Sequence, residues 1–199
     1  NAGKALTGIN NTLIGSIAGD ALVAGDNNTV LGYNAMGAAN GSESRNVAIG
    51  SNALSAMDND ASNYNTAIGF YAGKAMTTGT TTTLVGGFAG DALTTATENT
   101  ALGYAALSAA TTSARNVAVG TLALGSGVMN TGTNTYNTAV GFYAGKEIST
   151  GINNTLIGSL AGDALTIGNN NVAMGYGALS TSVDGDYNTA VGHQALQDY

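Results

Sequence analysis

The sequence is built from one short motif, Asn-Thr-x-x-Gly-x-x-Ala, which returns along the whole chain of 199 residues. Successive copies begin 17 to 21 residues apart, and most of the steps are 17. A short fixed period is the signature of a repeat protein, in which each unit is too small to fold alone and stacks on its neighbours. The copies begin at Asn11, Asn28, Asn46, Asn65, Thr82, Asn99, Asn116, Asn137, Asn154, Asn171 and Asn188.

The residue pattern inside each copy is that of a β-strand closed by a turn. With the first residue of each copy as position 1, position 2 is Thr or Val, position 3 is Ala, Leu or Val, and position 4 is large and apolar. Position 5 is always Gly and position 8 is always Ala. Alternation with period two indicates a strand, and glycine permits a sharp corner. We therefore expect an all-β fold, a parallel β-solenoid (β-roll) of about twelve coils of 17–21 residues.

The same pattern suggests which columns of residues lie inside the coil. Thr and Val are nearly isosteric, and they share a face with the large apolar residues of position 4. We therefore expect positions 2 and 4 in the interior. The small residues at positions 3 and 5 would then form a flat outer face on which another chain can pack. The Asn column is expected to stack amide on amide between coils.

Four successive short repeats form a longer repeat of about 72 residues. It divides one repeat array, residues 1–199, into super-repeats of approximately 1–64, 65–136 and 137–199. The first residues match the inside of a repeat, so we expect the array to be a fragment of a longer fibre. The super-repeat is marked by Ala-Gly-Lys at Lys4, Lys74 and Lys146 and by Ala-Gly-Asp at Asp20, Asp91 and Asp163.

This register places opposite charges in the same column of neighbouring coils. Residues that share a column lie about one strand spacing apart, so we expect stacked, exposed salt bridges worth about 0–1 kcal/mol each. They would help to set the register of the coils. The expected pairs are Lys4 with Asp20, Lys74 with Asp91, Lys146 with Asp163, and Glu98 with Arg115.

Composition excludes several classes of function. The chain has no cysteine and one histidine, His193, which leaves no thiol nucleophile and no multi-histidine metal centre. No base stands beside the many serines and threonines, so we expect no enzyme activity, no catalytic residue, no metal and no cofactor. Five basic residues against twelve acidic ones argue against nucleic acid as a partner. No apolar run reaches the roughly 18 residues that would insert into a membrane.

Binding residues are expected among the aromatics and the longest loops. Aromatics follow the position-5 glycine and recur as Phe70-Tyr71 and Phe142-Tyr143, so at least one of each pair is expected to point outward. These rings either pack the coils or form a stacking platform for sugars. The loops 56–64 and 126–136 interrupt the period, and the acidic run in 58–63 partly resembles a calcium loop. The candidate ligand-binding residues are Tyr71, Tyr143, Asp58, Asp60, Tyr64 and Tyr136.

The repeat resembles the head repeats of trimeric autotransporter adhesins, the YadA-like heads. The resemblance is carried by Asn46-Val47-Ala48-Ile49-Gly50, Asn65-Thr66-Ala67-Ile68-Gly69 and Asn116-Val117-Ala118-Val119-Gly120. It implies a left-handed parallel β-roll and three chains around an axis. The unit here is longer than the usual head unit. The ending from Asn188 to Leu196 is similar to repeats in phage and marine-virus tail fibres.

These observations predict a non-enzymatic, adhesive or structural segment of a homotrimeric fibre. The first hypothesis is a viral tail fibre on the virion surface that presents or spaces host-receptor binding, with a host cell-surface glycan or protein as partner. The alternative is a bacterial trimeric adhesin head on the outer surface. A third hypothesis is a monomeric solenoid whose Thr column binds ice or another ordered surface. In each case we expect an extracellular location.

Overall fold

The computed structural model describes residues 1–4, 6–129 and 134–197 of the chain. Within them it contains one parallel sheet of eleven strands in sequential order and no helix. Neighbouring strands pair in strict register, Thr66 with Thr83 for example. The strands are β1 Thr12–Ile14, β2 Thr29–Leu31, β3 Val47–Ile49, β4 Thr66–Ile68, β5 Thr83–Val85, β6 Thr100–Leu102, β7 Val117–Val119, β8 Thr138–Val140, β9 Thr155–Ile157, β10 Val172–Met174 and β11 Thr189–Val191.

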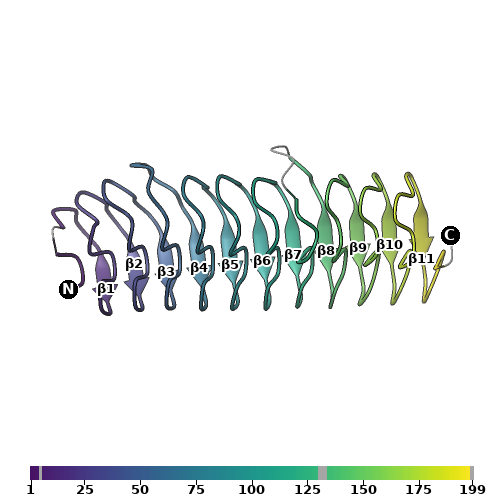
Figure 1. The fold of residues 1–199 in the computed structure, drawn as a ribbon, viewed down its shortest axis with the longest axis horizontal. Coiled ribbons are helices and arrows are strands. Elements are labelled where there is room, and N and C mark those ends of the chain that lie inside the picture. The colour runs from purple at the N-terminus through teal and green to yellow at the C-terminus, as the bar shows by residue number, and fades with distance from the viewer. Residues whose placement is uncertain (5, 130–133, 198–199) are drawn as a thin grey trace.

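The coils stack into a straight rod with the strands side by side along it and the termini at opposite ends (Figure 1). The sequence-based expectation of a parallel β-solenoid is confirmed. Its turn count is slightly different: eleven strands enclose about ten complete turns, because the chain ends lie in partial turns, where about twelve coils were expected. Ten strand spacings of about 4.8 Å give a sheet roughly 50 Å long.

Backbone hydrogen bonds join the coils beyond the strands themselves. Gly32 N donates to Ile14 O at 2.8 Å, just after β1 and β2 end, and Gly73 N donates to Ala89 O at 3.0 Å behind the sheet. The strands have three residues each, because residues with positive φ turn the chain on both sides. Tyr64 before β4 has φ 55°, and Gly69 after it has φ 142°.

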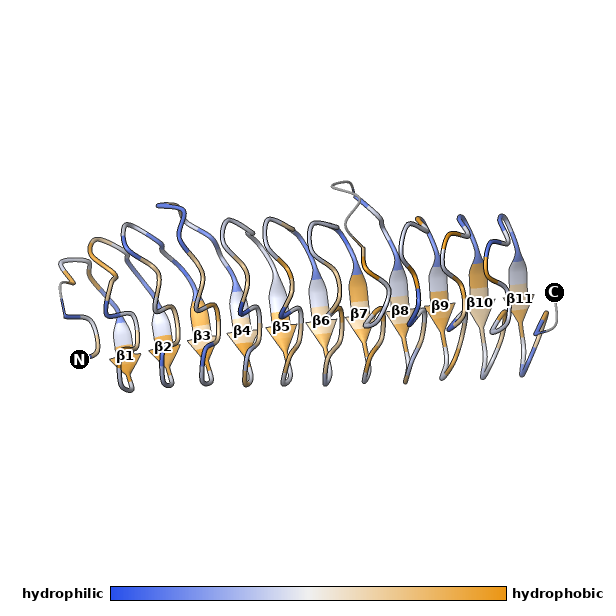
Figure 2. Cartoon of the chain, in the orientation of Figure 1, coloured by the Kyte–Doolittle hydropathy of each residue, from blue (hydrophilic) through white to orange (hydrophobic). Residues whose placement is uncertain are grey.

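The two faces of the sheet are the reverse of the expectation from sequence. Position 3 points inward: Ala67 and Ala101 are fully buried, and Leu84 is 1% exposed. Positions 2 and 4 point outward, as Thr83 and Leu102 do. Hydrophobic colour marks the carboxyl ends of the strands, where position 4 lies (Figure 2). The interior cannot take a large β-branched residue from every strand, because residues of the opposite side already fill it.

The buried residues fit by exchanging volume between two columns. At position 9, opposite the sheet, Gly90 stands where its neighbour coil has Leu107. A Cβ on Gly90 would lie 2.7 Å from Leu84 Cδ2, so the large Leu84 of position 3 needs a glycine opposite it. Ala101, at position 3 of the next coil, leaves room for Leu107. This exchange explains the glycine of the Ala-Gly-Asp steps, because interiors are packed to crystal-like density. In the Ala-Gly-Lys step at Lys74 the glycine makes room for the leucine of the next coil, since a Cβ on Gly73 would lie 2.8 Å from Leu84 Cδ1.

Position 1 forms a ladder of side-chain amides, most of them buried. The side-chain oxygen of each asparagine from Asn11 to Asn171 accepts the backbone N–H of position 1 in the next coil, at 2.8–3.2 Å. Thr82 interrupts the series, since its hydroxyl donates to Thr80 O instead. In addition Asn171 Nδ2 donates to Asn154 Oδ1 at 3.0 Å, and Asn154 Nδ2 donates to Asn137 Oδ1 at 3.1 Å. The expected amide stacking is confirmed. Because most of these groups are buried, a rung that loses its partner leaves a polar group unsatisfied inside the coil.

We expect Leu84→Ala to lower the free energy of unfolding by about 2–5 kcal/mol, through the cavity it leaves. Gly90→Leu alone should also destabilise, since its side chain would collide with Leu84. The double variant should recover at least half of the loss, because it recreates the pairing of Ala101 with Leu107, whose φ of 57° matches the 55° of Gly90. Denaturant unfolding of the three variants measures this; losses that simply add would contradict the volume exchange.

Asn154→Ala should lower the free energy of unfolding by about 2–5 kcal/mol, because it removes partners from Asn171, Asn137 and Gly168 inside the coil. Asn154→Thr is the matched variant, since Thr82 occupies the same column naturally and donates to Thr80 O at 3.1 Å. Its loss should be clearly smaller in the same urea titration. An Ala variant as stable as the parent would contradict the role of the ladder, and equal losses for Ala and Thr would show that a hydroxyl in this column restores none of the lost hydrogen bonds.

Candidate functional site

The outward side of the sheet, here called the strand face, carries two uncharged rows. Position 2 gives a Thr row and position 4 an apolar row, and both repeat in register at every strand. Ile14 is 57% exposed, Leu102 48% and Val191 64%. The rows are Thr12, Thr29, Val47, Thr66, Thr83, Thr100, Val117, Thr138, Thr155, Val172 and Thr189, and Ile14, Leu31, Ile49, Ile68, Val85, Leu102, Val119, Val140, Ile157, Met174 and Val191.

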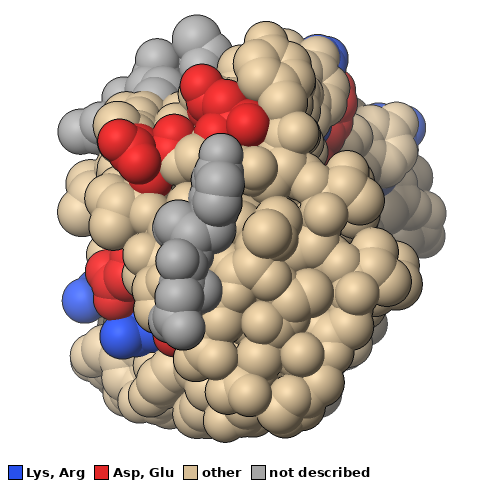
Figure 3. Space-filling model, turned by 90° about the vertical axis from the view of Figure 1, so that its right-hand side faces the viewer, with Lys and Arg blue, Asp and Glu red and all other residues tan. Residues whose placement is uncertain are grey.

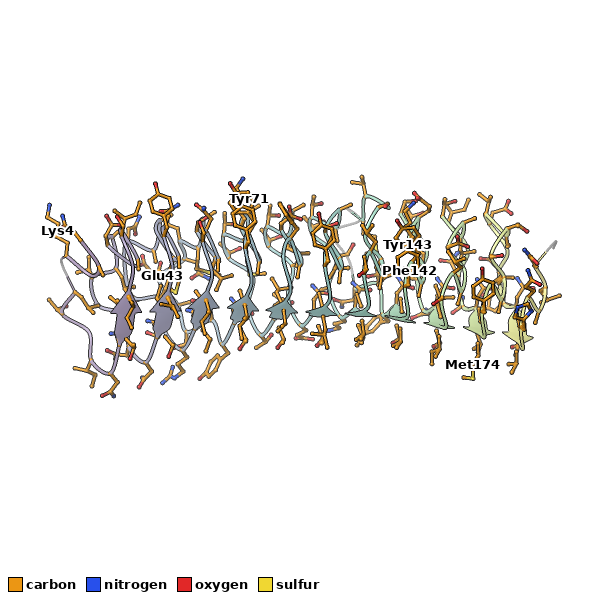
Figure 4. All side chains as sticks on the ribbon, turned by 90° about the horizontal axis from the view of Figure 1, so that it is seen from below. Lys4, Glu43, Tyr71, Phe142, Tyr143 and Met174 are labelled. Carbon is orange, nitrogen blue, oxygen red and sulfur yellow. The ribbon has the colours of Figure 1, made fainter. Side chains whose placement is uncertain are left out.

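Neither row contains a charged or aromatic side chain. In Figure 4 Met174 of the apolar row points to one side of the rod, and Tyr71 and Tyr143 lie on the other. Seen from the C-terminal end, charged side chains gather on the upper and left-hand parts of the outline and leave the lower right uncharged (Figure 3). A row of large apolar side chains roughly 50 Å long without one charge is unusual for a surface that stays in water.

A column of polar and aromatic side chains precedes the strands. Arg115 Nε donates to Glu98 Oε2 at 2.6 Å, and Arg115 Nη1 donates to the Tyr136 hydroxyl at 2.8 Å. The expected Glu98–Arg115 pair is thus present. The hydrogen bond from Arg115 lowers the pKa of Glu98, with their Coulomb attraction adding to it, and Glu98 in turn raises the pKa of Arg115. One super-repeat earlier, the Arg45 guanidinium lies 5.3 Å from the Tyr64 ring centroid.

The other expected ladder pairs do not form ion pairs within 4 Å in the described chain, where lysine side chains turn to nearer partners. Lys74 Nζ lies 4.4 Å from the Tyr71 ring centroid, and Lys146 Nζ bonds Glu147 Oε1 at 2.9 Å and lies 5.0 Å from the Tyr143 ring centroid. A shared column does not decide the rotamer of a long side chain, and an adjacent aromatic face is closer. The pairs concerned are Lys4 with Asp20, Lys74 with Asp91, and Lys146 with Asp163.

Asp91 and Asp163 are half-buried carboxylates whose pKa values are raised above 3.8. Desolvation by burial is the largest cause in both, opposed by backbone hydrogen bonds and by the lysine of the preceding coil. Asp163 Oδ1 is buried without a hydrogen-bond partner in the structure. The lysines therefore act on these carboxylates only through Coulomb attraction. This attraction does not offset the desolvation that raises the two pKa values.

Two of the candidate ligand-binding residues have both ring faces covered. Tyr71 stacks on Phe70 with 4.0 Å between ring centroids, and Lys74 covers its other side. Tyr143 stacks on Phe142 at 3.9 Å and has Lys146 above it. These tyrosines are packed between neighbours. The more exposed members of the pairs are the phenylalanines, each 48% exposed.

Ring contacts continue from Phe70 across two further coils. Phe70, Tyr71, Phe88 and Tyr104, here called the aromatic cluster, are linked by centroid distances of 4.0–5.8 Å. Tyr104 is 57% exposed and Phe88 half-buried. At the C-terminal end Tyr176 stacks on His193 at 5.4 Å, which gives His193 an aromatic neighbour. The cluster is an open surface, since the described residues enclose no pocket.

The loop at 58–63 is organised by Glu43, a residue that the sequence analysis missed. Glu43 is fully buried (Figure 4), and its Oε1 accepts the N–H groups of Asn59 and Asp60 at 3.0 and 3.1 Å. Its Oε2 accepts Gly41 N at 3.1 Å. Asp60 Oδ1 accepts Ser42 N at 3.1 Å. The one available signal was that this repeat position, otherwise small or polar, holds a glutamate beside the insertion.

This loop geometry favours a hydrogen-bonded turn over a cation site. Asp58 is exposed, while Asp60 and Glu43 accept backbone N–H groups. No cluster of three or more metal-ligating side chains occurs in the parts of the chain that are described. Of the second loop, residues 130–133 lie outside the described residues, and Tyr136 at its end contacts Arg115. The six candidate residues are therefore not gathered into one site.

No family model, curated protein or solved structure matches this chain. Within the described ranges, no helix is long and apolar enough to cross a bilayer. The surface features that remain are the strand face and the aromatic cluster.

We expect Asp91→Asn combined with Asp163→Asn to raise the melting temperature at pH 7. Because the folded-state pKa values of both groups are raised, their ionised forms disfavour the folded state, and this cost is relieved as pH falls through the raised values towards 3.8. The gain over the parent chain should therefore shrink below about pH 4. Thermal melts from pH 3 to 8 test this, with exposed Asp184→Asn as the control for net charge; a gain independent of pH would contradict it.

Proposed function

We propose that this chain is a non-enzymatic segment of a homotrimeric fibre, in which the strand faces of three chains pack around a common axis. The observation that carries the proposal is the unbroken apolar row outside the sheet, from Ile14 to Val191, with no charge in it or in the Thr row beside it. Burial of such side chains is worth about 25 cal/mol per Å² of apolar surface. A second copy offers the same row at the same spacing.

The regular geometry of the face supports a closed assembly of parallel rods. Side chains repeat at one strand spacing along the whole sheet, so a partner in the same orientation meets an equivalent side chain at every coil. The Thr row adds hydroxyls and methyl groups of nearly constant height. Cyclic symmetry closes such an interface, and three copies form the arrangement implied by the resemblance to YadA-like heads. That resemblance also implies left-handed coils.

The same resemblances support a proposal for the kind of fibre to which this segment belongs. The repeats from Asn188 to Leu196 support a viral tail fibre, in which the segment spaces or presents host-receptor binding at the virion surface. The YadA-like units support a bacterial adhesin head as the alternative. In both proposals the rod is extracellular and its partner is a cell-surface glycan or protein.

A second candidate function gains support from one observation. The Thr row points outward, where it was expected inside, and a straight, equally spaced row of exposed Thr can match an ordered surface such as ice. This function needs the strand face free, so it belongs to a monomer. Oligomeric state therefore separates the two proposals.

Sedimentation equilibrium should give three times the chain mass of 19.5 kDa. Ile68→Lys with Leu102→Lys should weaken association at least 100-fold, because each trimer would bring six ammonium groups together in an apolar interface. Both residues are exposed in the single chain, so the fold should survive, which far-ultraviolet circular dichroism verifies. Thr95→Lys, at an exposed site away from the strand face, is the matched control and should remain a trimer.

A folded monomer at high concentration would contradict the fibre proposal. If that monomer also lowered the freezing point of its solution below the melting point of ice, the second candidate function would replace it. A trimer that tolerates both lysines would show that another face carries the assembly.

A further inference from the structure

The coil from Thr82 to Glu98 departs from the repeat beside the aromatic cluster. At position 6, directly after the corner glycine, it has Gly87, where every other coil has Ser, Thr, Tyr, Phe or His. At position 7 it has Phe88, the one phenylalanine in that column. In an array of near-identical units, packing is explained by what the units share. A departure confined to one coil therefore needs another reason.

Packing does not require the glycine at position 87. A Cβ there would have Tyr104 Cδ2 at 3.7 Å and Phe70 O at 4.0 Å as its nearest neighbours, which is ordinary van der Waals contact. Its φ also lies outside the positive range that favours glycine. What the glycine does is place no side chain between two rings, because Phe70 and Tyr104 occupy position 6 of the coils on either side.

The rings around Gly87 are arranged as two walls and a base. Phe70 and Tyr104 are 48% and 57% exposed. Each meets Phe88 edge-on, with centroid distances of 5.3 and 5.8 Å and interplanar angles of 78° and 72°. Phe88 is half-buried between them. Stacking of Tyr71 on Phe70 fixes the first wall from behind.

The electrostatics of this platform select the class of ligand. Aromatic faces carry negative charge density and attract the weakly positive C–H groups on the flat side of a sugar ring. A cationic ligand is disfavoured, because Lys74 Nζ already lies 4.4 Å from the Tyr71 ring centroid beside the cluster. Lys74 and the half-buried Asp91 share position 10 of neighbouring coils, and the attraction of Lys74 acts on the Asp91 carboxylate, so this lysine is already opposed by a negative charge and favours an acidic sugar little.

We propose that the aromatic cluster around Gly87 is a binding platform for a neutral pyranose ring of a glycan. The inference rests on the proposed function, since it supplies the surface by which a fibre segment would hold a host glycan. One platform per chain gives three in the fibre, so weak single contacts gain from multivalency.

The chain contains its own control for this inference. The equivalent positions of the next super-repeat, 72 residues later, hold Phe142, Ser159, Leu160 and Tyr176. The walls are kept there, while the glycine and the base ring are replaced. Gly87→Ser with Phe88→Leu thus converts the platform into a natural sequence of the same fold, and Ser159→Gly with Leu160→Phe converts the control into a platform.

The test is saturation-transfer difference NMR and tyrosine fluorescence titration of the full chain. The probes are maltohexaose, cellohexaose, mannohexaose and chitohexaose, with a galacturonate hexamer as the acidic comparison. We expect at least one neutral hexamer to bind with transfer to its ring C–H groups. The G87S/F88L variant should lose at least tenfold in affinity at an unchanged melting temperature. The S159G/L160F variant should double the number of binding sites.

Three results would overturn the inference: no neutral hexamer binds, G87S/F88L binds as the parent does, or only the acidic hexamer binds. A change of assembly mass in G87S/F88L without a change in sugar affinity would also overturn it, by assigning the cluster to the contact between chains. A trimer without sugar binding leaves the fibre proposal intact, and a monomer that binds sugar removes the fibre proposal alone. The two failures are therefore distinguishable.

Discussion

In-register stacking of each coil on the next is the constraint on which this structure depends. Backbone groups bond from coil to coil along the strands and behind them, so every residue type becomes a column with a repeat of about 4.8 Å. Each residue of a buried column must pack against the same position of the next coil as well as against the other columns. Buried amides solve this by forming a ladder, and buried leucines solve it by facing glycines across the interior.

The same constraint turns the outer surface into rows. A residue that would be one exposed leucine in a globular protein becomes part of an apolar line along the rod. Because the apolar residue repeats at every coil, a matching partner must have the same spacing. A second copy of the chain has that spacing, which makes the strand face a surface for self-association. It also makes departures from the repeat informative: Gly87 and Phe88 have no counterpart in other coils, and neither backbone geometry nor crowding calls for the glycine.

Much of the fold could be predicted from sequence, because period, register and the Asn column follow directly from spacing. Which face of the sheet points into the coil could not be predicted. Alternation shows that positions 2 and 4 share a face, and only the volume of the interior decides which face it is. The signal was present in the pairing of Leu84 with Gly90 and of Ala101 with Leu107, which shows that position 3 meets position 9 inside.

Site residues were harder to predict because they depend on rotamers. Glu98 and Arg115 meet as their column suggests, whereas Lys74 turns to the ring of Tyr71. Glu43 could not be assigned, since its partners are backbone N–H groups of a loop whose path the sequence does not give. Covered ring faces on Tyr71 and Tyr143 likewise come from side-chain geometry that no spacing determines.

The central claim is that strand faces of parallel chains meet, and electron–electron distance measurement tests it most directly. The chain has no cysteine, so one spin label can be placed on the strand face at Thr29 or, in a second variant, at Thr155. Both labels should give the same single short distance, because parallel chains around an axis bring equal coils together at either end of the rod. Distances that differ between the two positions, or no dipolar interaction at all, would contradict the account.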